Sequence, residues 1–417
     1  MRRQRPIGTM RSIGTIGSIR TMVTIVLMGL MVACSSEVEE GALPAVPITF
    51  SCGESETAGT YGTNETYGSR AVNGQTGYVS DVNGHLLYSG FGVFAKEEGA
   101  EMFDFMSNQK VEFNFLANDP KSLYDGYWSY QPLKYWPYKY NGTKNVPKTL
   151  TFCAYAPYVE RPADDFKNDP ENKGIIGMSA NNDAIPYILY ARGKQLDECV
   201  DLLWCCEEAD NAEKGVTLKM NHALARISVK MTLTAVDGDI KKVLIERVSL
   251  TGSIAKKGKL HLTSHETATV GTETFRYPTW EVKDGDKENA TIVIDCDPKQ
   301  YHLDNPLHET YGIIAESVRY VKGLPKDWQP KGLEKDKTVN ILTQDDDQHV
   351  YLLLIPQNPL NLTAHIQLQV YRGDNTEPER VTRNSVEFRV GEPADAADED
   401  KTLYGNRPYN LELKISL

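Results

Sequence analysis

The chain of 417 residues lacks the motifs that mark most enzymes. It contains no nucleophile elbow, no phosphate-binding loop and no His-Glu zinc motif. The cysteines do not have the spacing of a zinc site, and neither do His261 and His265. The acidic runs 284–286 and 345–347 lack the ligand spacing of an EF-hand calcium loop. We therefore predict no catalytic residue, no metal and no cofactor.

Positive charge is also scarce. The chain has 45 Lys and Arg against 57 Asp and Glu, which gives a net charge of −12. The first 33 residues contain arginines and no acid, so the remainder of the chain is more acidic still. Such a surface repels phosphate backbones, and this excludes nucleic acid as a partner.

The one marked apolar run, residues 22–33, is shorter than the ~20 residues that a membrane span requires. Arg20 precedes it and Cys34 follows it directly. A positive region, an apolar core and a small residue before a cysteine are typical of a lipoprotein export signal. We predict that residues 1–33 are a signal peptide and that Cys34 carries the lipid anchor. The alternatives are a helix hairpinned against the membrane without lipid, and plain secretion with cleavage nearby.

Helical periodicity is rare, whereas apolar and polar residues alternate in many short stretches. The alternation is sharpest in residues 225–233, 366–370 and 411–417, each of which predicts a strand with one buried face. Residues 196–208 are the best candidate for a helix. Abundant tyrosine, glycine and proline also favour short strands. We predict an all-β fold of two antiparallel β-sandwiches that meet near the loop 210–214.

Apart from Cys34, six cysteines allow disulfides whose pairing the sequence does not determine. Cys153, Cys205 and Cys296 lie in apolar stretches, where free thiols pack as small hydrophobic groups. If residues 205 and 206 belong to one strand, Cys205 and Cys206 point to its opposite faces.

A further strand is predicted close to the N-terminus. Val46, Ile48, Phe50 and Cys52 alternate with smaller or polar residues and form one dry face. Pro47 cannot donate a backbone hydrogen bond, which suits a strand at a sheet edge. We interpret these residues as a removable strand.

A candidate cleavage site follows that strand. Residues 53–69 are rich in Gly, Ser, Thr and Glu, which is typical of a flexible loop. Arg70 is the one Lys or Arg between Cys34 and Lys96. Arg70 is therefore the site in this stretch that a trypsin-like protease could cut. The alternative is that Arg70 is an ordinary loop charge.

Residues 124–140 are dense in Tyr and Trp. They could form a stacking platform for sugars, or an aromatic strand pair that closes one end of a sandwich.

Several segments, taken in order, resemble the fimbrillin family of Bacteroidales. They are residues 69–72 (SRAV), 91–95 (FGVFA), 128–132 (WSYQP), 134–137 (KYWP), 150–157 (LTFCAYAP), 200–205 (VDLLWC) and 221–226 (NHALAR). The resemblance covers the whole chain after the signal. It implies two transthyretin-like β-sandwich domains, which we place at residues 71–214 and 215–417. It favours the structural interpretation of the aromatic run.

The resemblance also implies a function. Members of that family are lipoprotein precursors of type V pili or related surface adhesins, located at the outer membrane and then in the fimbrium. An Arg-specific protease would cut between Arg70 and Ala71 and release residues 34–70. Other fimbrillin subunits would then bind by β-strand addition. A host or bacterial surface receptor is a further expected partner.

Two questions stay open. Residues 409–416 are expected to complete the second domain, so a tip or accessory subunit is favoured. A stalk subunit remains an alternative if the linker 391–401 lets this strand swing out. The competing function is an outer-membrane surface lipoprotein that never polymerises. It would bind carbohydrate or a host ligand through aromatics such as Trp280, Tyr320 and Trp328.

Overall fold

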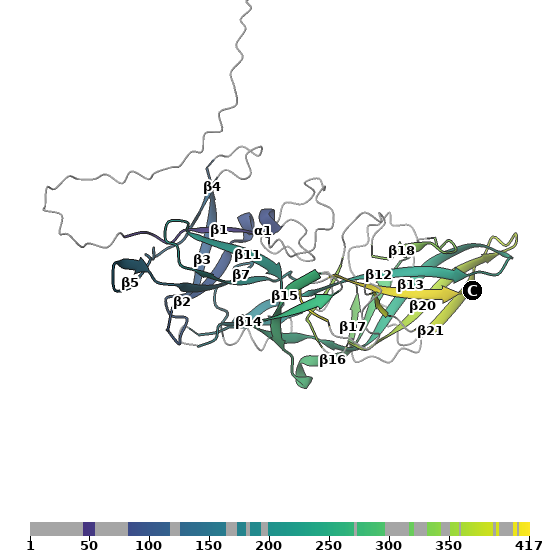
Figure 1. Ribbon diagram of the computed structural model, residues 1–417. Helices are drawn as coiled ribbons and strands as arrows, with labels where there is room; N and C mark the ends of the chain where they lie inside the picture. Colours follow the sequence, from purple (N-terminus) through teal and green to yellow (C-terminus); the bar gives the residue numbers. More distant parts are fainter. Residues whose placement is uncertain are drawn as a thin grey trace, which may run out of the picture. The chain divides into compact units, whose positions relative to one another are not determined.

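The computed structural model is almost entirely β-structure (Figure 1). The structure describes residues 45–54, 82–116, 126–163, 173–180, 184–192, 199–270, 273–296, 317–320, 332–342, 351–357, 360–386, 389–391, 403–406 and 408–417. Ala45–Leu417 forms one compact unit. The prediction of an all-β fold is confirmed. Among the described helices, none is both long and apolar enough to cross a membrane.

The largest sheet has seven strands in the order β1-β11-β10-β7-β2-β3-β4. Their bounds are β1 (Phe50–Glu54), β2 (Phe91–Glu97), β3 (Met106–Phe115), β4 (Gly126–Ser129), β7 (Leu150–Ala156), β10 (Leu203–Ala209) and β11 (Val216–His222). The pairs β2–β3, β2–β7, β7–β10 and β10–β11 are antiparallel, whereas β1 and β11 are parallel. The short helix α1 (Val82–Ser89) buries Val82 and Leu86.

The central strands of this sheet are buried on both faces, because each face packs against its own apolar cluster. We name these clusters core A and core B. Core A includes Ile48, Phe50, Leu86, Phe91, Val111, Trp136, Phe152, Cys205 and Leu218. Core B includes Phe94, Cys153, Tyr155, Tyr190, Trp204, Ile227, Leu260, Ile292, Ile366 and Leu411. In β7, successive residues therefore alternate between the two cores, as the pleat requires.

The other strands that the structure describes form four further sheets. One has the order β15-β14-β9-β8, with β8 (Gly174–Met178), β9 (Tyr187–Ala191), β14 (Lys257–Val270) and β15 (Glu273–Glu281). A second contains β12 (Ala225–Ala235), β18 (Thr338–Asn340), β19 (Leu352–Leu354), β22 (Arg389–Gly391) and β23 (Pro408–Ser416). A third contains β13 (Ile240–Ala255), β16 (Lys287–Asp295), β17 (Ser317–Tyr320), β20 (Leu362–Arg372) and β21 (Glu379–Val386). The fourth is the pair β5 (Tyr138–Tyr140) and β6 (Asn145–Pro147).

The three stretches with the sharpest alternation are strands, as predicted. They are β12, β20 and β23. The helix predicted for residues 196–208 is wrong where the structure describes it, because Leu203–Ala209 is the strand β10. The first residues of β10 are buried on both faces of the sheet, so the sequence there lacks the alternation of a half-buried strand.

The division into domains at residue 214 stays a prediction. A boundary there would separate two paired strands, because β10 and β11 pair antiparallel on either side of it. Val216, Leu218 and Met220 of β11 also pack in core A, together with residues that precede the loop.

Candidate functional site: the N-terminal segment and its seat

We call residues 45–54 the N-terminal segment. The first half of this segment pairs with residues 134–136. The Ile48 N–H donates to the Lys134 carbonyl at 2.9 Å, and the Trp136 N–H donates to the Val46 carbonyl at 3.0 Å. Pro47 lies opposite Tyr135 in this antiparallel bridge. On the side of the segment, both hydrogen bonds are made by Val46 and Ile48, which flank Pro47. Pro47 has no N–H, but this pairing does not require one from it.

The second half of the segment, β1, pairs with β11 on the other side. β1 lies beside β11 (Figure 1), and Phe50 to Glu54 run parallel to Val216 to Met220, one residue against one. The Val216 N–H donates to the Thr49 carbonyl at 2.8 Å, just ahead of the ladder. β1 is the terminal strand in the order of the sheet. The segment is thus an edge strand held by short pairings on two different neighbours.

Close approach at this point depends on Gly215. Its φ is +69°, in the left-handed region that favours glycine. A Cβ built on Gly215 would meet the Thr49 carbonyl oxygen at 3.0 Å and would overlap the Thr49 hydroxyl.

The side chains of the segment alternate between core A and solvent. Ile48 is 1% exposed and Phe50 is 8% exposed, whereas Thr49 and Ser51 are exposed. Val46 and Cys52 are half-buried and pack against core A. Burying one Ile or Phe side chain contributes about 1.5–3 kcal/mol. The apolar face therefore supplies most of the energy that seats the segment.

Aromatic residues form the part of the seat that receives Phe50. Its ring lies 6.0 Å from Phe91, 5.5 Å from Tyr130 and 5.8 Å from Phe152, each in an edge-on arrangement. The Tyr130 hydroxyl donates to the Ile48 carbonyl at 3.0 Å. Burial raises the pKa of Tyr130 above its ordinary value, so the hydroxyl stays protonated and can donate.

We use the word seat for β11, Tyr130, residues 134–136, Phe91 and Phe152. Sequence reasoning missed these residues as contacts of the N-terminal segment. A signal was present, since the seat includes parts of four segments that carried the family resemblance: 91–95, 128–132, 134–137 and 150–157. Sequence alone did not show that these segments converge on one strand.

Cys52 is a free thiol on the apolar face of the segment. Burial raises its pKa to about 12, so it is protonated at neutral pH. Cys205 also faces core A, but it lies on β10, and β11 separates β10 from β1. Two strand spacings of about 4.8 Å are too far for a disulfide. No cross-link therefore ties Cys52 to this cysteine.

Cys153 and Cys206 form a disulfide between β7 and β10, at directly opposed positions. The expectation that Cys153 is a free thiol is wrong for this reason. The expectation that Cys205 and Cys206 face opposite sides of one strand is confirmed: Cys205 packs in core A and Cys206 against core B. Which cysteines meet depends on the strand register, and the sequence does not state it.

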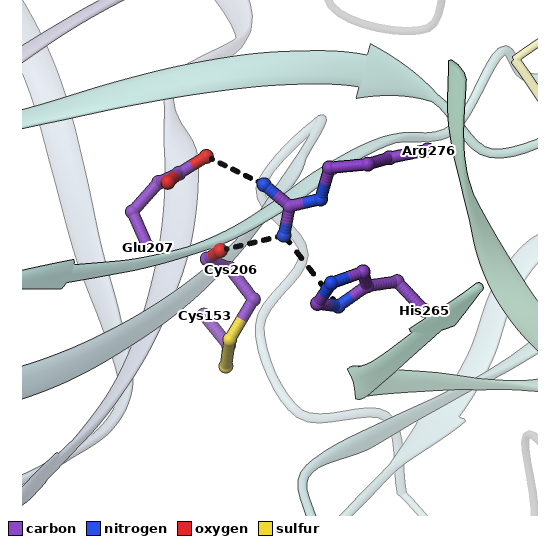
Figure 2. The surroundings of a disulfide bond; sticks show 5 residues. All are labelled: Cys153, Cys206, Glu207, His265 and Arg276. Atoms are coloured by element: carbon purple, nitrogen blue, oxygen red, sulfur yellow. Dashed lines mark hydrogen bonds and ion pairs between the residues drawn. A yellow bond between two sulfur atoms is a disulfide. The ribbon is translucent and has the colours of Figure 1, made fainter. Parts of the chain in front are cut away.

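Arg276 of β15 reaches the backbone beside the disulfide (Figure 2). Its guanidinium donates to the Cys206 carbonyl at 3.2 Å and pairs with Glu207 at 3.4 Å. It also lies 3.5 Å from Nδ1 of His265. These contacts connect the hairpin β14–β15 to the strand that carries Cys206.

Two segments that carried the resemblance also meet in the interior. Oδ2 of Asp201 and Nδ1 of His222 are 2.8 Å apart, and both side chains are at most 1% exposed. Asp201 precedes β10 and His222 ends β11. The pair therefore links the beginning of β10 to the end of β11.

The aromatic run serves both the interior and the surface. Tyr130 and Trp136 are buried in core A, whereas Tyr127, Tyr135 and Tyr140 are exposed. Trp280, a suggested ligand contact, packs against core B, and its Nε1–H donates to the Ala223 carbonyl at 3.0 Å. Trp328 and the side chain of Tyr320 lie outside the described residues.

The C-terminal strand lies inside a sheet, whereas its completion of a second domain stays a prediction. β23 lies between β12, to which it is parallel, and β22, to which it is antiparallel. Leu411, Leu413 and Ile415 are buried in core B.

The remaining predicted site residues fall elsewhere. Cys34, Arg70 and Ala71 lie outside the described residues. The removable strand, with Val46, Ile48, Phe50 and Cys52, is seated as described above, and its removal stays a prediction. In the part of the chain that the structure describes, no cluster of His, Cys, Asp and Glu could hold a metal.

Comparisons with known proteins give one family. Residues 88–301, just over half of the chain, match the fimbrillin-like family. No curated protein sequence matches.

Several solved structures align with most of the chain. A candidate cell adhesion protein from Bacteroides uniformis is 12% identical, with 89% of this chain and 94% of that chain covered and a TM-score of 0.35. Another from Bacteroides ovatus is 14% identical, with 90% and 93% covered and a TM-score of 0.34. A fimbrial assembly protein from Parabacteroides distasonis is 10% identical, with 82% and 89% covered and a TM-score of 0.21. These scores are too low to decide fold or function, so the family match carries the conclusion. The chain belongs to the fimbrillin-like family.

Proposed function

We propose that the chain is the lipoprotein precursor of a fimbrial subunit and that a strand from a neighbouring subunit replaces its N-terminal segment. The seating of residues 45–54 carries this proposal. An edge strand that buries alternate side chains can be exchanged for another strand with the same pattern, because strand addition uses backbone groups common to every sequence.

Export comes first in the proposed sequence of events. The lipid on Cys34 anchors the precursor at the outer membrane, where the acylated cysteine gives stable attachment. An Arg-specific protease then cuts between Arg70 and Ala71. Both residues belong to the stretch 55–81, which connects β1 to α1. The cut separates the N-terminal segment covalently from its seat.

Loss of the segment leaves β11 with few partners. In the described register, Val216 to Met220 pair with β1, whereas His222 and Asn221 pair with β10. An empty seat therefore exposes the backbone edge of β11 and the apolar surface of core A. A strand from another subunit restores both, which gives assembly its driving force.

The position of β23 supports a tip or accessory subunit. This strand would have to leave both β12 and β22, and expose three buried aliphatic side chains, before it could be donated. A subunit that accepts a strand more readily than it gives one belongs at the end of a fibre.

The test is cleavage followed by assembly. Purified precursor is treated with an Arg-specific protease, the new N-terminus is read by mass spectrometry, and fibres are counted by electron microscopy. We expect a cut after Arg70, release of residues 34–70 and fibres in the wild type, but none of these in Arg70→Ala. Arg383→Ala, which alters a half-buried arginine on β21, is the control and should behave as wild type. A precursor that keeps residues 34–70 on intact cells would contradict the proposal.

The competing function is a surface lipoprotein that binds carbohydrate or a host ligand without polymerising. The exposed rings of Tyr127 and Tyr140, at 55% and 67%, are the observation that favours it. Exposed aromatic rings are suited to stacking on sugars. Tyr127→Ala and Tyr140→Ala would then reduce adhesion without affecting cleavage.

A further inference from the structure

We infer that the Cys153–Cys206 disulfide keeps the seat assembled during the interval in which no strand occupies it. This inference rests on the proposed function, since it concerns the state between release of one strand and arrival of another. The disulfide joins β7 and β10 directly. It lies on the face that packs in core B, behind the surface that receives the N-terminal segment.

The two bonded strands carry the seat on their other face. Phe152, the neighbour of Cys153, contacts the ring of Phe50. Cys205, the neighbour of Cys206, packs in core A as well. A cross-link behind the sheet therefore fixes the spacing of the side chains in front of it.

The need for such a link follows from the register of β11. When β1 leaves, β11 retains the described pairing of Asn221 and His222 with β10. β10 is then the strand that pairs with β11, and β10 must itself remain paired with β7. A covalent bond between β10 and β7 prevents these two strands from separating, and β11 keeps a fixed neighbour.

The distribution of thiols agrees with this role. Cys52 leaves with the segment and has no cross-link to the rest of the protein. Cys206 on β10 is bonded to Cys153 on β7, and both of these strands remain when the segment leaves. The disulfide thus stabilises the acceptor without obstructing the exchange.

The bond forms by thiol–disulfide exchange with an oxidant that is itself a disulfide, of a protein or of a small thiol. One cysteine thiolate attacks that disulfide and releases one thiol. The second cysteine attacks the mixed disulfide and releases the other thiol. The two cysteines lose two electrons and two protons in total, and the oxidant becomes two thiols. Such oxidants operate in the compartments through which exported proteins pass.

The experiment uses the full chain with a site for a sequence-specific protease inserted after Ser69, so that cutting does not depend on Arg70. The cut protein is stripped of its N-terminal fragment, and a synthetic peptide of residues 45–54 is added back. The variant is Cys153→Ala with Cys206→Ala. The matched control is Cys199→Ala with Cys296→Ala, which removes two buried cysteines of core B and leaves the disulfide in place.

We expect non-reducing peptide mapping to find Cys153 bonded to Cys206. The stripped wild type and the control should bind the peptide with equal affinity, whereas the variant should bind at least tenfold more weakly. Hydrogen exchange in β10 and β11 should be at least tenfold faster in the stripped variant. The uncut proteins should bind no added peptide.

If the double variant does not fold, reduction of stripped wild-type protein with a phosphine provides the same comparison. Equal peptide affinity with and without the disulfide would overturn the inference, and so would two free thiols in the peptide map. A stripped wild type that binds the peptide but forms no fibres would contradict the proposed function alone. A fragment that cannot be removed from the cut wild type would overturn both.

Discussion

The ring of Phe50 meets the ring of Phe152 edge to face, with the centroids 5.8 Å apart and the planes at 88°. Phe50 belongs to the strand that we expect to leave, and Phe152 to a strand that remains. Edge-to-face pairs contribute about 0.5–1.5 kcal/mol beyond the burial of their area. This contact joins the two parts of the molecule that function would separate.

Phe50→Ala should therefore loosen the N-terminal segment. We expect the free energy of unfolding to fall by about 3–5 kcal/mol, because a buried aromatic side chain is lost and a cavity remains. The same mutation should also speed release of the segment after the chain is cut at Arg70. Denaturant titration and the rate of fragment release measure the two effects. Ser51→Ala, at an exposed position of the same strand, is the control; it loses only an exposed hydrogen bond to Thr217 and should cost no more than about 1.5 kcal/mol.

Gly215→Ala should displace the segment at Thr49. The new Cβ would overlap the Thr49 hydroxyl, and the left-handed φ adds about 1–2 kcal/mol of strain. Gly99→Ala is a matched control, since Gly99 has a φ of +80° and no atom within 4 Å of its added Cβ. Both variants carry the backbone strain, but Gly215→Ala alone should speed hydrogen exchange at the Val216 amide. Equal exchange in the two variants would show that the close approach has no role.

Cys52 should report departure of the segment through its reactivity. Its pKa is about 12 when seated and should return to about 8.5 in the released fragment. Alkylation requires the thiolate, so labelling at pH 8 should accelerate on the order of a thousandfold after release. The same pKa shift determines how the stability of the seated segment depends on pH. The seated thiol favours the protonated form, so seating is strongest below pH 8.5 and weakens as the pH rises toward 12. Labelling that proceeds equally fast before and after release would contradict this.

Asp201→Ala should destabilise the fold through the buried contact with His222. Removing one partner of a buried hydrogen bond costs roughly 1–3 kcal/mol. The exposed ion pair of Arg372 with Asp239 is the comparison, and Asp239→Ala should cost no more than about 1 kcal/mol. Thermal denaturation of both variants at one pH measures the difference. A loss in Asp239→Ala as large as that in Asp201→Ala would contradict the expectation.

The sequence predicted strands well where one face is buried and the other is wet. β20 and β23 have this pattern, and so do the N-terminal segment and the part of β12 from Val229 onward. It failed at β10, whose Leu203 and Trp204 are buried on opposite faces and so interrupt the alternation. Period-2 hydrophobicity reports exposure of one face, and it disappears when both faces are covered.

Pairing over long distances was beyond the reach of the sequence. β1 is parallel to β11, and β12 is parallel to β23, although each pair is separated by many residues. The contact between Phe50 and Tyr130 and the Cys153–Cys206 bond depend on these registers. Side-chain patterns determine which face a residue occupies, whereas neighbours in a sheet follow from the packing of the whole chain.

Pro47 has a consequence for the solubility of the protein. The hydrogen bonds of Val46 and Ile48 point toward residues 134–136, so the backbone nitrogen of Pro47 faces the other way. A proline there offers no N–H to an approaching chain. Unpaired N–H groups on edge strands are a common cause of aggregation between sheets. The same residue that leaves the intramolecular pairing intact therefore reduces association of this edge with other chains.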